Sequence, residues 1–127
     1  RFLAEAEILV CLLPLTDKTE GILNTELFSK LPKGAYLINV ARGGHLLETD
    51  LIEALNNRQL SGAALDVFHT EPLPQDHLFW NRNDVTITPH IASMSNAASV
   101  SAQIAENYNR VKNGEELLNT VSSEKGY

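Results

Sequence analysis

Short apolar runs alternate with amphipathic stretches along this chain. The first run, ILVCLL at 8–13, is apolar at every position and is followed by Pro14. Such a run is typical of a parallel strand that is buried on both faces. Three later runs, AYLINV, GAALDV and VTIT, are mostly apolar, so the predicted strands are 8–13, 35–40, 62–67 and 85–88.

The stretches between these runs predict helices. Apolar residues three and four positions apart indicate helices at 24–31, around 51–55 and at 95–113. Asn24 and Thr49 are the expected N-caps of the first two helices, and Asn113-Gly114 is the expected end of the third. The tail from Glu115 is polar, and we expect it to be loosely held.

Strands that alternate with helices predict an α/β fold in which right-handed crossovers build a parallel sheet. Ligands of such sheets bind beyond the carboxyl ends of the strands. Charged residues gather at those ends here. Arg42 and two glycines follow the second strand, Asp66 lies in the third and is followed by Glu71-Pro72, and Pro89-His90 follows the fourth.

Each of these residues also has an ordinary structural explanation. A single histidine is more often a surface or core residue than a catalyst, and most arginines are simply solvated. Asp66 is unusual because a carboxylate inside an apolar strand needs a partner or a ligand. Four such residues at one predicted edge favour a site. The other histidines, His45, His69 and His77, have no comparable setting.

The four residues suit one kind of chemistry. A carboxylate beside a histidine favours the protonated imidazole, which can then give and take a proton near neutral pH. An arginine offers a planar fork for a substrate carboxylate. These groups fit the reversible reduction of a 2-keto acid. No side chain supplies a hydride, so a nicotinamide cofactor is implied.

Composition narrows the alternatives. The 127 residues carry 10 basic and 16 acidic side chains, a net charge of −6, which disfavours binding to nucleic acid or to an anionic membrane. The longest apolar run is far short of the ~20 residues that cross a bilayer. A single cysteine, Cys11, cannot form an internal disulfide and fits a cytoplasmic location. There is no spacing typical of zinc ligands, no G-x-S-x-G elbow and no nucleotide P-loop.

Four blocks occur in order along the chain and together span about residues 6–93. They are LPLT with the following Thr19 and GILN, KGAYLINVARGG, GAALDVF with EPLP, and TITPHIAS. In this order they resemble the D-isomer-specific 2-hydroxyacid dehydrogenase family. The resemblance implies the second half of a doubly wound, Rossmann-like NAD(P)-binding domain, followed by a C-terminal helix. The family's G-x-G-x-x-G loop has no counterpart here, so we expect this chain to be the C-terminal part of a longer enzyme.

The resemblance also implies roles for individual residues. Arg42 would bind the carboxylate and carbonyl of the substrate, His90 would be the general acid, and Glu71 would be the partner of His90. Asp66 would lie near the nicotinamide carboxamide. The residues implied to contact the cofactor are Leu13, Pro14, Val40, Ala41, Arg42, Asp66, His90, Ala92 and Ser93. No metal is implied.

Two stretches, KLPKGAYL at 30–37 and KGY at 125–127, resemble the glyoxylate/hydroxypyruvate reductase branch of the family. That branch implies glyoxylate or hydroxypyruvate as substrate, either NAD or NADP as cofactor with NADPH favoured, and a homodimeric parent enzyme. Residues 1–94 would form the cofactor-binding part, and 95–127 a helix and tail that pack on a substrate domain absent from this chain. We expect this chain alone to be inactive.

Other functions remain open at this point. The chain could belong to another dehydrogenase of the family, of the phosphoglycerate or D-lactate type. From a different class, it could be a binding module like the co-repressors that share this fold, or an inactive remnant that associates only with itself.

Overall fold

The structure is a computed structural model that describes residues 2–93 and 95–122. The KGY stretch at 125–127 therefore lies outside the described residues. The chain divides into two compact units, Arg1–Ala92 and Ser93–Tyr127, and each is described by itself.

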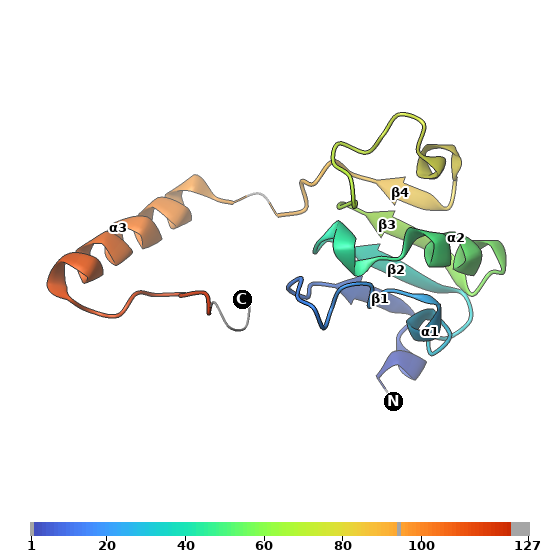
Figure 1. Cartoon of the computed structure of the whole chain (residues 1–127), viewed down its shortest axis with the longest axis horizontal. Helices are drawn as coiled ribbons and strands as arrows, with labels where there is room; N and C mark the ends of the chain where they lie inside the picture. The colour runs from blue at the N-terminus through green and yellow to red at the C-terminus, as the bar shows by residue number, and fades with distance from the viewer. Residues whose placement is uncertain (1, 94, 123–127) are drawn as a thin grey trace. The chain divides into compact units, whose positions relative to one another are not determined.

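The first unit is built on a four-stranded parallel sheet (Figure 1). The strands follow one another in chain order across the sheet and are β1 (Ile8–Cys11), β2 (Ala35–Asn39), β3 (Leu60–Leu65) and β4 (Val85–Ile87). The predicted parallel α/β fold is confirmed. Each observed strand stops one or two residues before its predicted end, so more residues lie in the loops beyond the strands.

There are two short helices, α1 (Thr25–Phe28) and α2 (Glu48–Asn56); α2 packs on β3 and α1 packs against α2. Asn24 caps α1 as predicted, because its side chain accepts a hydrogen bond from the backbone N–H of Leu27 at 3.0 Å. The prediction that Thr49 caps α2 is wrong. The helix begins two residues earlier than predicted, at Glu48 after Leu47, whose backbone N–H donates to the carbonyl of Leu23 at 3.0 Å. Pairing with a neighbouring segment, rather than a side-chain cap, sets the start of this helix.

The core lies on one face of the sheet. Leu9, Leu37, Ala63 and Val85 form one row across the four strands, and all are buried against the apolar side chains of α1 and α2. The other face differs, because Ile8 is 61% and Val10 46% exposed. The prediction that the first strand is buried on both faces is wrong for this chain, since β1 is an edge strand with one face uncovered.

The second unit consists of α3 (Ala97–Asn113) and the segment after it. Asn96 caps the start of α3, and Gly114 ends it with a left-handed φ of 71°, as predicted for the Asn-Gly pair. The tail is held more firmly than expected. The Asn107 side chain accepts from the backbone N–H of Leu118 at 2.8 Å and donates to its carbonyl at 3.2 Å. This pairing satisfies backbone groups that the sequence pattern left unassigned.

Apolar side chains along α3 are exposed. They are Val100, Ile104, Tyr108 and Val111. Across the described residues, no helix combines the length and the apolar character needed to cross a bilayer.

Candidate active site

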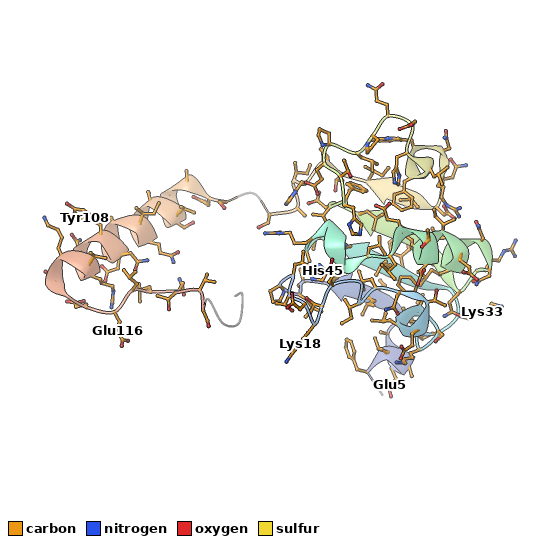
Figure 2. The ribbon with its side chains drawn as sticks, viewed as in Figure 1. Glu5, Lys18, Lys33, His45, Tyr108 and Glu116 are labelled. Carbon is orange, nitrogen blue, oxygen red and sulfur yellow. The ribbon has the colours of Figure 1, made fainter. Side chains whose placement is uncertain are left out.

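The predicted site lies at the edge of the sheet where the parallel strands end. In Figure 2, His45 and Lys18, which follow β2 and β1, lie at one edge of the first unit, and Lys33, which precedes β2, lies at the opposite edge. Side chains from separate loops therefore converge at one edge, as parallel topology requires.

The turn after β2 presents Arg42. The buried side chain of Asn39 shapes this turn by accepting from the backbone N–H of Ala41 at 3.1 Å and donating to the carbonyl of Arg42 at 3.1 Å. The guanidinium of Arg42 is exposed, and its Nη1 donates to the carbonyl of Ala41 at 2.6 Å. Its other N–H groups have no hydrogen-bond partner among residues 2–93 and 95–122, and they can bind a carboxylate.

Gly43 allows the ends of β2 and β3 to meet. A Cβ atom at this position would lie 2.0 Å from the backbone carbonyl carbon of Phe68 and 2.5 Å from the backbone nitrogen of His69. Backbone atoms cannot move aside as a flexible side chain can, so only glycine fits. This contact places Arg42 beside the loop that follows β3.

Asp66 organises the loop after β4. It follows the end of β3, and so does not lie inside a strand as predicted. Its buried carboxylate accepts from the Thr88 hydroxyl and from the backbone N–H groups of Ile91 and Ala92, both at 2.9 Å. The partner that a buried carboxylate needs is thus supplied by the protein itself.

These contacts keep Asp66 ionised. Burial by itself raises the pKa of Asp66, but the hydrogen bonds from Thr88, Ala92 and Ile91, together with the charge of His90, outweigh it and lower the pKa. A buried anion therefore lies under the loop that carries His90.

His90 and Glu71 form a direct pair. His90 Nδ1 and Glu71 Oε2 are 2.8 Å apart, and the other carboxylate oxygen accepts from the backbone N–H of Phe68 at 2.9 Å. The backbone of His90 is left-handed, with φ of 54°, and its N–H donates to the carbonyl of Asp66 at 2.9 Å. Because Glu71 takes the Nδ1 side of the ring, proton exchange with a substrate falls to Nε2.

The hydrogen bond from His90 lowers the pKa of Glu71, and the bond from the Phe68 backbone lowers it further. Glu71 therefore stays a carboxylate across the neutral range and can hold a protonated imidazole. The pair can donate and recover a proton.

The residues expected to line the cofactor lie in several places. Leu13 and Pro14 are exposed in the loop after β1, Val40 is half-buried and Ala41 buried after β2, and Ala92 is held by Asp66. Ser93 begins the second unit, so it is not placed against the others.

The sequence reading missed the residues that hold this framework in place. Asn39 was marked only by being polar in a buried strand, and Thr88 lay in the predicted fourth strand without an assigned role.

The donor set at this edge provides an anion-binding fork and a proton-transfer pair but no redox group, and it fits a hydride-carrying cofactor.

A parallel α/β sheet that presents an arginine and a histidine–glutamate pair at its carboxyl edge is characteristic of nicotinamide-dependent dehydrogenases. The family model for the NAD-binding domain of D-isomer specific 2-hydroxyacid dehydrogenases matches residues 1–92, and the chain belongs to this family.

Relatives of known name agree with this assignment. The chain is 50% identical over 126 residues to glyoxylate/hydroxypyruvate reductase A of Serratia proteamaculans, which is 99% of this chain and 40% of that relative. It therefore spans well under half of the relative's length.

Solved structures show the same similarity. A D-isomer specific 2-hydroxyacid dehydrogenase from Xanthobacter autotrophicus, in complex with NADPH and MES, has a TM-score of 0.95 and 45% identity over 99% of this chain and 52% of that one. The NADPH-dependent glyoxylate/hydroxypyruvate reductase of Sinorhizobium meliloti, in complex with NADP and sulfate, has a TM-score of 0.94 and 38% identity over 99% of this chain and 42% of that one.

Proposed function

We propose that this chain supplies the proton-transfer and substrate-binding residues of an enzyme that reduces glyoxylate or hydroxypyruvate with NAD(P)H. The observation that carries the proposal is the His90–Glu71 pair, 2.8 Å apart, on the same sheet edge as the exposed fork of Arg42. The 50% identity to a glyoxylate/hydroxypyruvate reductase A supports the choice of substrate over those of phosphoglycerate and D-lactate dehydrogenases.

Each residue has a separate task in the proposed reaction. Arg42 holds the substrate carboxylate through two parallel hydrogen bonds and orients the adjacent carbonyl. His90 donates its Nε2 proton to the carbonyl oxygen, and Glu71 keeps the ring oriented and stabilises its protonated form. The bound nicotinamide supplies the hydride that the carbonyl carbon receives. The product is the 2-hydroxy acid, and the neutral imidazole recovers a proton from solvent.

We assign the cofactor to the loops after β1, β2 and β4 of the first unit, with contacts from Leu13, Pro14, Val40, Ala41 and Ala92. Arg42, Asp66 and His90 would face its nicotinamide end. NADPH is favoured over NADH, since the Xanthobacter and Sinorhizobium relatives are described with NADPH or NADP.

We further propose that α3 and its tail pack on a substrate domain, because their apolar residues are exposed within the second unit. The parent enzyme is proposed to be a cytoplasmic homodimer. The single buried cysteine, Cys11, fits a reducing compartment.

The test is to assay the full-length parent enzyme with a panel of 2-keto acids and both reduced nicotinamides. Glyoxylate and hydroxypyruvate should be the best substrates, with 3-phosphohydroxypyruvate and pyruvate much poorer. Preference for either of the last two would assign the enzyme to another branch of the family. Failure to reduce any of them would favour a binding module or an inactive remnant.

Arg42→Lys in the same enzyme tests the assigned binding role. Lysine keeps the charge but loses the fork, so the KM for the keto acid should rise by roughly 10-fold or more while the KM for the nicotinamide stays nearly unchanged. Arg58→Lys, on the loop before β3, is the control and should change neither value. If nicotinamide affinity fell as much as keto-acid affinity, the role given to Arg42 would be wrong.

A further inference from the structure

His45 is fully buried at the edge of the sheet that carries the candidate site (Figure 2). Its Nδ1 lies 3.0 Å from the carbonyl oxygen of Arg42, and its Nε2 lies 3.2 Å from the carbonyl oxygen of Pro14. Arg42 follows β2 and Pro14 follows β1, so this one ring spans the loops of two neighbouring strands.

Both partners of the ring are carbonyl oxygens, which accept hydrogen bonds and cannot donate them. A neutral ring therefore donates to one of them, and a doubly protonated ring donates to both. The two carbonyls have other donors as well. The Asn39 amide reaches the carbonyl of Arg42 at 3.1 Å, and the Thr19 hydroxyl reaches that of Pro14 at 2.7 Å. Loss of the ring would thus leave neither oxygen without a partner.

The backbone of His45 is fixed by its own pairing. Its carbonyl accepts from the N–H of Leu23 at 2.8 Å, and the carbonyl of the preceding Gly44 accepts from the N–H of Gly21 at 2.9 Å. The ring is therefore attached to a backbone segment that hydrogen bonds hold in place. A fixed ring between two loops can set the distance between them.

We propose that His45 is a positioning residue that ties the Arg42 turn to the Pro14 loop. In the terms of the proposed function, on which this inference rests, the ring sets the substrate-binding arginine against a loop that contacts the cofactor. His45 acts through the backbone of its partners and touches neither ligand. The ring of His45 contacts two carbonyl oxygens, whereas the ring of His90 contacts a carboxylate.

Three substitutions in the full-length enzyme separate the two links. His45→Leu fills similar space without any donor. His45→Asn places an amide near the position of Nδ1, within reach of Arg42 but short of Pro14. His45→Gln places an amide near the position of Nε2, within reach of Pro14. Each variant is assayed for the KM of the keto acid, the KM of the nicotinamide, and kcat.

A neutral ring donates to only one of the two carbonyls, so we expect His45→Leu to raise one KM value by about tenfold, as the loss of one buried hydrogen bond permits, with kcat changed much less. If the donated bond goes to Arg42, the keto-acid KM rises and Asn restores it. If it goes to Pro14, the nicotinamide KM rises and Gln restores it. A ring that only stabilised the fold would lower the active fraction, and hence kcat, at unchanged KM. That result would overturn the proposal, as would equal recovery of the raised KM by Asn and by Gln.

His77→Leu is the matched control, because His77 is a partly buried histidine whose Nε2 contacts Glu48 at 3.1 Å, outside the site. It should change neither KM.

Amide hydrogen exchange gives a readout that needs no turnover. His45→Leu should speed exchange in residues 13–16 and 41–46, and His77→Leu should not. If exchange responded in this way but the enzyme reduced no 2-keto acid, the link would be supported and the proposed function overturned. Unchanged exchange in both segments would overturn the link itself.

Discussion

His90 and Glu71 are both open to solvent, with 49% and 36% of their side-chain surface exposed. An exposed ion pair is screened by water and adds little to folding stability. The loop nevertheless holds His90 in a left-handed conformation, which is unfavourable for a residue with a Cβ. A pair held at such a cost without a matching gain in stability is better explained by catalysis.

Substitutions of this pair should therefore affect activity more than folding. In the full-length enzyme, His90→Ala should lower turnover by about 10²–10⁴-fold, the range expected for a lost general acid. Glu71→Gln removes the carboxylate that favours the protonated imidazole. The pH at which reduction falls on the alkaline side should then move downward in a pH–rate profile.

The chain offers a matched control for the second variant. Glu48→Gln alters the other histidine–glutamate pair, His77–Glu48, which lies outside the site. Its pH–rate profile should coincide with that of the wild type. An unchanged profile for Glu71→Gln would refute the role given to the pair.

Asp66 predicts how stability responds to acid. Its pKa is lowered in the folded protein, so its contribution is present above the unfolded value of about 3.9 and is lost as pH falls through the lower folded value. Asp66→Asn should cost roughly 1–3 kcal/mol of unfolding free energy at pH 7, because the amide faces an N–H donor. The difference from wild type should shrink below about pH 4.

Urea denaturation of the chain at pH 7 and at pH 3 measures both quantities. Asp76→Asn, at an exposed position in the loop before β4, is the control and should change the unfolding free energy very little. A difference between Asp66→Asn and wild type that grew on acidification would contradict the assignment.

Arg42, Glu71 and His90 could be placed at one edge of the sheet from the sequence, because charged residues that follow parallel strands share that edge. The residues that hold this edge together could not be predicted in the same way. Asn39 binds the carbonyl oxygen of Arg42 in the turn that follows β2, and His45 binds that oxygen and the carbonyl oxygen of Pro14 in another loop. Every residue has a carbonyl, so nothing in the sequence marks which one a polar side chain will meet. For that reason nothing in the sequence pointed to a role for His45.

At the scale of elements, turn geometry decides more than helix propensity does. Leu47 starts α2 through its pairing with Leu23, and the expected cap at Thr49 falls inside the helix. The strand segments were predictable, because a continuous apolar run has few other interpretations. The exact ends of strands and helices depend on tertiary pairing that the pattern does not encode.

A substitution at Gly43 tests how closely the ends of β2 and β3 approach each other. Gly43→Ala puts a Cβ against the Phe68 backbone, and we expect a loss of about 1–3 kcal/mol, typical of an overpacked site. Gly44→Ala is the control, because its Cβ would meet only the flexible side chain of Leu15, at 3.0 Å. Chemical denaturation of both variants makes the comparison. Equal losses would show that the close contact is not the cause.

At the scale of the whole molecule, β1 leaves apolar surface uncovered. Its exposed residues, Ile8 and Val10, form an unpaired strand edge, the kind of surface that promotes association.

We therefore expect purified residues 1–127 to self-associate and to show no reductase activity. Hydride transfer needs the reacting atoms held about 3–3.5 Å apart, and the chain has no G-x-G loop to hold the cofactor pyrophosphate. Light scattering and assays of glyoxylate and hydroxypyruvate with NADH and NADPH test both points.

Val10→Lys should shift the mass toward a monomer, whereas His90→Ala should leave it unchanged. A well-behaved wild-type monomer would contradict the argument from the exposed strand. Turnover near that of a full-length reductase would contradict the need for a separate phosphate-binding loop.

The contact between His90 and Glu71 is closed wholly within the first unit, by loops that follow β3 and β4. A second polypeptide that carried a glycine loop and a substrate domain would thus need to bring no proton-transfer group of its own. We expect two such pieces, expressed from separate genes and paired along β1, to recover in a mixture the turnover that neither shows alone. A covalent link between the two pieces would only set their effective concentration for each other. The proton-transfer groups would lie on one side of β1 and the phosphate-binding loop on the other.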